Sequence, residues 1–228
     1  MPQRPDTGTA TGTAAGLAGG ALGLLLGGVA AVRRGKPLHP RGHVVRGTVV
    51  RTGCPERWGV PWLDEPGRDD AVVRFSHALG LPAGWPDVLG LALRFDGLGR
   101  DHDLLLATTG AGPLSRFALV PRVDLATATY GSLLPYASPR GPVLLAAVPT
   151  GWLDGAPAFG LEVAAARGPW QRFGLLRLDQ DPVAAGDAHL DLDPVENPLP
   201  GLAPTGIHAR LRSPAYRAAR LVRPEPVP

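Results

Sequence analysis

The sequence predicts a mainly β protein, an eight-stranded antiparallel β-barrel with a short C-terminal helix. Eight short β-rich runs, bounded by Gly, Pro and Asp, lie between residues 43 and 193. Glycine and proline are frequent, with 31 and 26 residues in 228, and no long apolar helical pattern lies among the runs. Eight is also the number of strands at which side chains just fill a closed barrel.

The eight runs fall into two groups of four, separated by a Ser-, Pro- and Gly-rich connection over 110–140. The first group is 43–51, 70–76, 88–95 and 102–109, and the second is 141–149, 158–166, 170–179 and 188–193. A helix is expected over 213–222, because Ser213 suits the N-cap and Pro214 the first helical position.

The first 35 residues form a separate region ahead of a barrel domain over 36–228. Residues 7–32 carry no charge and are mostly Gly, Ala and Thr. Three interpretations stay open: an arm or helix packed on the domain, a membrane helix, and a cleaved signal peptide. If residues 7–32 span a membrane, the basic residues within 33–36 would keep the domain that follows on the cytoplasmic side. We therefore expect a cytoplasmic protein, membrane-associated only if this run spans the bilayer.

Composition argues against a nucleic-acid-binding protein, because the net charge is only +3, the arginines are scattered and aromatic residues make up 6%. Cys54 is the single cysteine, so no internal disulfide can form. No metal-ligand spacing joins the remaining histidines, which are His43, His77, His102, His189 and His208. The acidic stretch 178–193 lacks the spacing of a calcium loop and is expected to form surface turns.

The segment HPRGHVVRG (39–47) resembles the strand of the catalase family that carries its essential distal histidine. Three further segments are similar to the family's next strands, in the same order: VRFS (73–76), DVLGLALRF (87–95) and HDLL (102–105). Near the C-terminus, ENPLPGL (196–202) resembles a Pro-Gly turn of the family, and Arg212-x-x-x-Tyr216 resembles its proximal motif. The resemblance implies a small catalase-like barrel that binds haem.

On this resemblance His39 is the base that moves a proton between the two oxygens of a peroxide. Ser76 matches the serine that orients this histidine, and Arg74 matches a guanidinium that pairs with a haem propionate. Lys36 stands where the family usually has a second propionate-binding arginine.

Tyr216 corresponds to the tyrosinate ligand of the haem iron, the metal-binding residue implied here, and Arg212 beside it favours the deprotonated phenol. Arg223 is a further basic residue that the resemblance implies for binding haem. A second register stays open, in which Pro214 takes the place of the tyrosine. In the favoured arrangement His39 points into the barrel, and Tyr216 lies across a flat cavity from it.

Ala107 falls where the family has its distal asparagine, and Thr108 is the nearest side chain that could hydrogen-bond peroxide instead. The resemblance therefore implies a slow, peroxidase-type oxidoreductase acting on peroxide or a small organic substrate. One alternative is a haem-free, non-catalytic barrel that serves as a binding or membrane-peripheral protein. Another is a hydrolase that uses His39, Arg41 and His43. The oligomeric state stays open.

Overall fold

The computed structural model describes residues 41–95, 99–182, 190 and 192–205. The chain divides into two units, 1–38 and 39–228, and all described residues belong to the second. Among them, no helix is long and apolar enough to cross a membrane. The expectations for residues 7–32 and for a helix over 213–222 lie outside the described residues.

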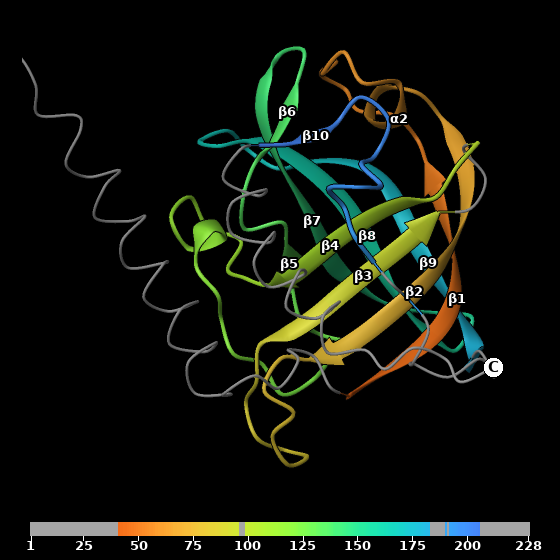
Figure 1. Cartoon of the computed structure of the whole chain (residues 1–228), viewed down its shortest axis with the longest axis vertical. Helices are drawn as coiled ribbons and strands as arrows, with labels where there is room; N and C mark the ends of the chain where they lie inside the picture. Colours follow the sequence, from red (N-terminus) through yellow and green to blue (C-terminus); the bar gives the residue numbers. More distant parts are fainter. Residues whose placement is uncertain (1–40, 96–98, 183–189, 191, 206–228) are drawn as a thin grey trace, which may run out of the picture. The chain divides into compact units, whose positions relative to one another are not determined.

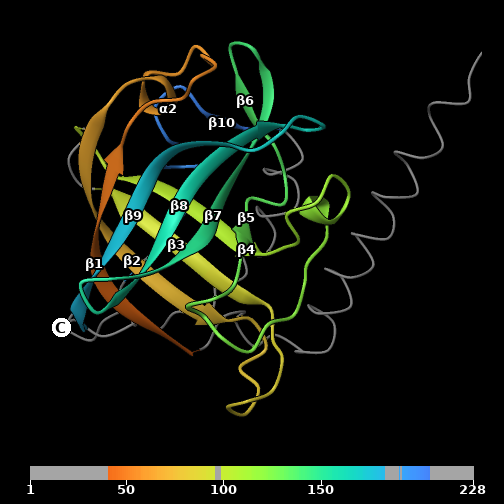
Figure 2. The same cartoon turned by 180° about the vertical axis from the view of Figure 1, so that it is seen from behind.

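Eight antiparallel strands close into a barrel (Figures 1 and 2). The strands of the ring are β1 (Arg41–Arg51), β2 (Gly67–His77), β3 (Leu89–Phe95), β4 (His102–Thr108), β5 (Tyr130–Gly131), β7 (Gly141–Leu153), β8 (Ala156–Ala165) and β9 (Gln171–Pro182). The order is β7-β5-β4-β3-β2-β1-β9-β8, and the pairing of β8 with β7 completes the ring. The predicted fold class, a mainly β eight-stranded antiparallel barrel, is confirmed.

Two further short strands lie beside the ring. β6 (Tyr136–Ser138) pairs with the first residues of β7, and β10 (Ala203–Pro204) pairs with β6. Two short helices interrupt the loops, α2 (Pro61–Asp64) and the 3₁₀ turn η1 (Ser115–Phe117).

One of the eight predicted runs was wrong. Residues 190, 192 and 193 form no strand, because Asp193 makes a turn instead: its carboxylate accepts hydrogen bonds from the backbone amides of Val195 and Glu196, at 2.9 and 3.3 Å. The eighth strand of the ring is instead β5, which lies inside the connection over 110–140. Two residues suffice there, because each pairs with β4 on one side and β7 on the other.

Alternate residues of the ring strands fill the barrel, as the period of a strand requires. Three aromatic rings meet in its interior: Phe75 lies 6.2 Å from Tyr130 and 6.1 Å from Phe159, measured between ring centroids. All three side chains are at most 3% exposed. The barrel therefore has a packed hydrophobic core rather than a channel.

α2 covers one end of the barrel (Figure 1). The ring of Trp62 packs edge-on against Phe95 and Phe173, with centroid distances of 5.5 and 5.2 Å. Asp64 fixes the turn before this helix, because its carboxylate accepts hydrogen bonds from the backbone amides of residues 58, 59 and 60, at 2.7, 2.8 and 3.1 Å. The opposite end of the barrel has no such plug among the described elements.

A buried carboxylate ties the segment after β9 to the barrel. Asp103 on β4 is fully buried and accepts hydrogen bonds from Arg94 Nε and Nη2, at 2.8 and 2.7 Å. It also accepts from the backbone amide of Asp193 at 2.7 Å and from Asn197 Nδ2 at 3.0 Å. Next to it, His102 Nδ1 donates to the carbonyl of Pro198 at 2.5 Å. These contacts place residues 193–202 against β3 and β4.

Candidate functional site

Two predicted site residues, Arg74 and Ser76, lie on the outer face of the barrel. Both belong to β2, where Val73 and Phe75 point into the hydrophobic core. Because successive side chains of a strand point to opposite faces, Arg74 and Ser76 share the outer face. Ser76 is nevertheless only 4% exposed, and Arg74 is half-buried. The two residues therefore share one face of β2, and their predicted roles stay predictions.

Ser76 belongs to a row of small residues that crosses the outer face of six neighbouring strands in register. Because each residue is the pairing partner of the next, the row runs straight across the sheet. We call it the small-residue row; its members are Gly42, Ser76, Gly90, Ala107, Gly131 and Ala146. Only hydrogen atoms, methyl groups and one hydroxymethyl group stand above the sheet here. The row is nevertheless covered, because Ser76, Gly90, Gly131 and Ala146 are buried and a Cβ built on Gly131 would meet Thr109 Oγ1.

The guanidinium of Arg74 lies beside this row. A Cβ built on Gly42 would stand 3.0 Å from Arg74 Nη2 and 3.1 Å from Arg74 Cζ, and would also collide with the Phe75 carbonyl oxygen. A side chain larger than glycine would therefore displace the guanidinium. Val44 and Ala92, the pairing partners of Arg74 on β1 and β3, are 5% and 8% exposed. Arg74 thus offers a cation at the edge of an apolar surface.

The position of the family's distal asparagine is occupied by Ala107, a member of the small-residue row, which cannot hydrogen-bond. The side chain of Thr108 is fully buried on the inner face, and its Oγ1 accepts a hydrogen bond from the amide of Leu89 at 3.1 Å. Thr108 therefore faces the barrel interior, and its expected hydrogen bond to peroxide stays a prediction.

The flat cavity predicted between His39 and Tyr216 stays a prediction, because both residues lie outside the described residues. Phe75, Tyr130 and Phe159 fill the core beneath the level of Ser76. The Tyr130 hydroxyl donates to the carbonyl of Leu125 at 2.8 Å, and burial, assisted by the charge of Asp124, raises the pKa of this phenol. A haem bound by Arg74 and Ser76 must therefore lie outside the barrel. Ser76 does not point to the interior that was expected for His39.

The remaining predicted site residues lie outside the described residues. They are His39, Lys36, Arg212, Tyr216 and Arg223, together with Pro214 of the alternative register. Their roles stay predictions. Of the proposed hydrolase cluster, His43 lies on the inner face at the open end of the barrel, where its ring stacks on Phe75 at 5.3 Å. It is therefore on the opposite face of the sheet from Ser76.

In the described part of the chain, no three His, Cys, Asp or Glu side chains come together in a way that could hold a metal ion. Cys54 is buried, and its thiol donates to Gln171 Oε1 at 3.4 Å.

Three solved structures resemble this chain. A fungal catalase superposes with a TM-score of 0.61 at 14% sequence identity, over 89% of this chain and 63% of that one. The barrel is catalase-like. A bacterial catalase gives a TM-score of 0.59 at 14% identity, over 96% of this chain and 61% of that one. Catalase A from Saccharomyces cerevisiae gives 0.60 at 11% identity, over 86% and 63%.

The catalase-like barrel thus spans less than two thirds of each of these catalases. At such low identity the likeness is one of fold. No protein-family model matches the sequence, and no curated protein sequence matches it.

One feature of the site, the continuity of the small-residue row, has no signal in the sequence. Its six members come from six strands, and each looks like an ordinary small residue in its own segment. Only the pairing register aligns them. The motif resemblance did place two of them, Ser76 and Ala107, at positions that the family uses.

Proposed function

We propose that this catalase-like protein is a haem-dependent oxidoreductase of the peroxidase type, acting on peroxide or a small organic substrate. One observation carries the proposal: Arg74 and Ser76 lie on the same outer face, beside the small-residue row. The chemistry proposed for this face rests on the resemblance of residues 39–47 to the distal-histidine strand of catalases.

The described residues fit a flat group that carries carboxylates. The members of the small-residue row add only hydrogen atoms, methyl groups and one hydroxymethyl group to this face, and the guanidinium of Arg74, which lies beside Gly42, could pair with a propionate by two parallel hydrogen bonds. In the proposal Tyr216 ligates the iron, and Arg212 keeps its phenol deprotonated. Lys36 and Arg223 add positive charge for the propionates.

Haem would supply the iron that reacts with peroxide. In the proposal His39 takes a proton from one peroxide oxygen and delivers it to the other, which eases departure of that oxygen as water. Ser76 holds the imidazole of His39 in one tautomer by a hydrogen bond. Ala107 offers no donor on this side, so turnover should be slower by roughly 10²–10³ than with an amide there.

A second function is a haem-free barrel that binds another molecule without catalysis. The observation in its favour is Ala107: the position that hydrogen-bonds peroxide in the family carries a methyl group in this chain. The two functions differ in whether the protein takes up haem.

Haem titration of the purified full-length chain tests the proposal. We expect a one-to-one complex with a Soret band. Arg74→Met should weaken haem binding roughly 10- to 100-fold, because a charge-assisted hydrogen bond is lost. Arg46→Met is the matched control, because Arg46 is an exposed arginine on the same outer face that pairs with β2 in a different row. It should leave the affinity unchanged.

Two variants then separate binding from chemistry. Tyr216→Phe should abolish haem retention, whereas His39→Ala should retain haem and lose its reaction with peroxide. If the wild-type chain takes up no haem, the oxidoreductase proposal fails and the haem-free barrel stands. Equal haem affinity of the Arg74 and Arg46 variants would place any bound haem away from the small-residue row.

A further inference from the structure

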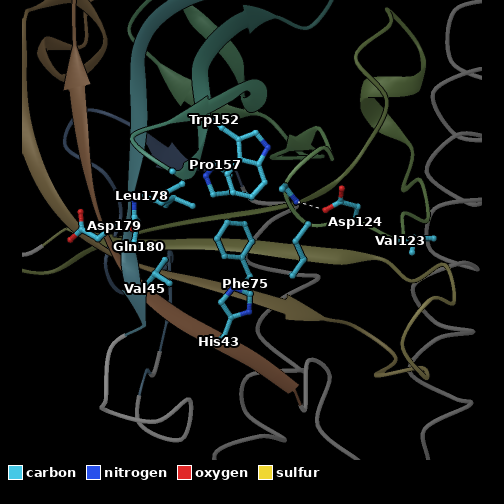
Figure 3. A pocket seen from close by; sticks show the side chains of 14 residues that line it. His43, Val45, Phe75, Val123, Asp124, Trp152, Pro157, Leu178, Asp179 and Gln180 are labelled. Carbon is cyan, nitrogen blue, oxygen red and sulfur yellow. Dashed lines mark hydrogen bonds between the residues drawn. The ribbon is translucent and has the colours of Figure 1, made fainter.

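The end of the barrel opposite α2 holds a cavity of about 870 Å³ (Figure 3). Its walls come from the start of β1, the end of β2, the loop over 123–126, the β7–β8 turn and the end of β9. These five segments meet only because the ring closes. We call this cavity the barrel mouth. It lies on the inner side of the sheet, so it is distinct from the small-residue row.

The floor of the barrel mouth is a rigid aromatic surface. Phe75 is 3% exposed and is held from below by Tyr130 and Phe159. The ring of His43 stacks on Phe75 with an interplanar angle of 20°. Because these rings are already packed, a ligand that binds there needs little further ordering of the protein.

An exposed tryptophan forms another wall. Trp152, at the end of β7, is 68% exposed, and Figure 3 shows its indole across the cavity from the ring of Phe75. The turn that follows it is braced, because the carboxylate of Asp154 pairs with Arg177 and its carbonyl accepts from Gln180 Nε2. The protein thus holds a large apolar side chain in solvent beside a cavity, which is typical of a binding surface.

The rim of the barrel mouth is acidic. Asp124 and Asp179 both line it, and Figure 3 shows them on opposite sides. Asp124 accepts hydrogen bonds from the amide of Ala126 at 2.9 Å and from Thr127 Oγ1 at 3.0 Å, which fix its position without neutralising its charge. No arginine or lysine is among the described residues that line the cavity. The site is therefore negative in a chain whose net charge is +3.

We propose that the barrel mouth binds a small organic monocation, an ammonium or quaternary ammonium group attached to an apolar body. The indole face of Trp152 attracts such cations, and the rim carboxylate of Asp124 strengthens the attraction. The apolar body would lie on the floor formed by Phe75 and Val45. A carboxylate- or phosphate-bearing ligand is disfavoured, because it would meet Asp124 and Asp179. This site is independent of the haem proposal.

Calorimetric titration of the full-length chain tests the inference, with benzyltrimethylammonium as the probe. Benzyl alcohol and benzenesulfonate provide a neutral and an anionic aromatic molecule of similar size. The cation should bind at least tenfold more tightly than the alcohol, and the sulfonate should bind most weakly. The advantage of the cation should shrink as salt is added, because salt screens the two exposed carboxylates.

Trp152→Ala should weaken binding of the cation roughly 10- to 30-fold, since a cation–π contact contributes most when it is desolvated. Asp124→Asn and Asp179→Asn should each weaken it by a factor of about 2–5, as expected for exposed charges. Trp85→Ala is the matched control, because Trp85 is 64% exposed and does not line the cavity. It should bind as the wild type does.

The inference is overturned if the chain does not bind benzyltrimethylammonium, or if the alcohol or the sulfonate binds as tightly. It is also overturned if Trp152→Ala and Trp85→Ala have the same affinity as the wild type. Trp152 is exposed, so its variant should keep the circular dichroism spectrum of the wild type. Haem uptake is expected to be the same in all these variants, which separates this test from that of the oxidoreductase.

Discussion

Replacing Asp103 with asparagine should greatly destabilise the barrel. The substitution keeps the shape of the side chain but removes a fully buried charge that accepts four hydrogen bonds. The guanidinium of Arg94, whose side chain is 15% exposed, would lose its closest carboxylate. Removing one partner of a buried ion pair lowers the free energy of unfolding by about 3–5 kcal/mol. The partial exposure of Arg94 favours the lower end of this range, about 3 kcal/mol.

Thermal and urea denaturation measure this effect. For a domain of this size a loss of about 3 kcal/mol should lower Tm by about 6–12 °C. Asp101→Asn is the matched control, because Asp101 pairs with the same Arg94 at 3.6 Å but its side chain is 54% exposed. An exposed pair contributes less than about 1 kcal/mol, so Tm should fall by at most about 4 °C.

Comparable losses for Asp101→Asn and Asp103→Asn would refute the reasoning, because burial could not then be the source of the difference. A second result would also contradict it. If Asp103 and Arg94 act as a unit, the double variant Asp103→Asn/Arg94→Gln should lose less stability than the sum of the single variants. Strict additivity would show that the pair is not coupled.

Burial raises the pKa of the Tyr130 phenol and of the Cys54 thiol. Both groups therefore hold their protons more tightly in the folded state, so urea midpoints should be constant below about pH 8 and fall above about pH 9–10. Tyr130→Phe should reduce this fall, and an unchanged pH profile would contradict the assignment. Phe159→Ala should cost about 3–5 kcal/mol in urea denaturation, whereas Trp85→Ala should stay within about 0.5 kcal/mol; similar costs would contradict the core assignment. Asp64→Ala leaves three backbone amides without their acceptor and should cost about 2–3 kcal/mol; a loss below about 0.5 kcal/mol would show that solvent replaces the carboxylate.

The barrel was predictable because seven of its eight strands are long enough to show a β pattern with turns at both ends. β5 is too short for any pattern, since two residues carry no periodicity. The opposite error concerns the run 188–193, where AHLDLD alternates like a strand. Its described residues, Leu190, Leu192 and Asp193, form no strand, because the amide of Asp193 donates to the buried Asp103 rather than to a neighbouring strand.

The site was only partly predictable. Alternation along β2 indicates that Arg74 and Ser76 share a face, and the apolar Val73 and Phe75 between them could have identified that face as the outer one. Nothing in the sequence indicates the barrel mouth. Its five segments are brought together only by closure of the ring, and each carries ordinary residues such as Trp152 near the end of β7.

The closure of the ring also has a consequence for synthesis of the chain. β1 is the first described strand to leave the ribosome, and its partner β9 is among the last: Thr52, just after β1, hydrogen-bonds the carbonyl of Phe173, which is 121 residues further along. Until β9 emerges, the free edge of β1 stays unpaired and open to other chains. Long-range pairing of this kind folds slowly. The nascent barrel should therefore depend on chaperones that shield strand edges, and should aggregate when translation stalls before β9.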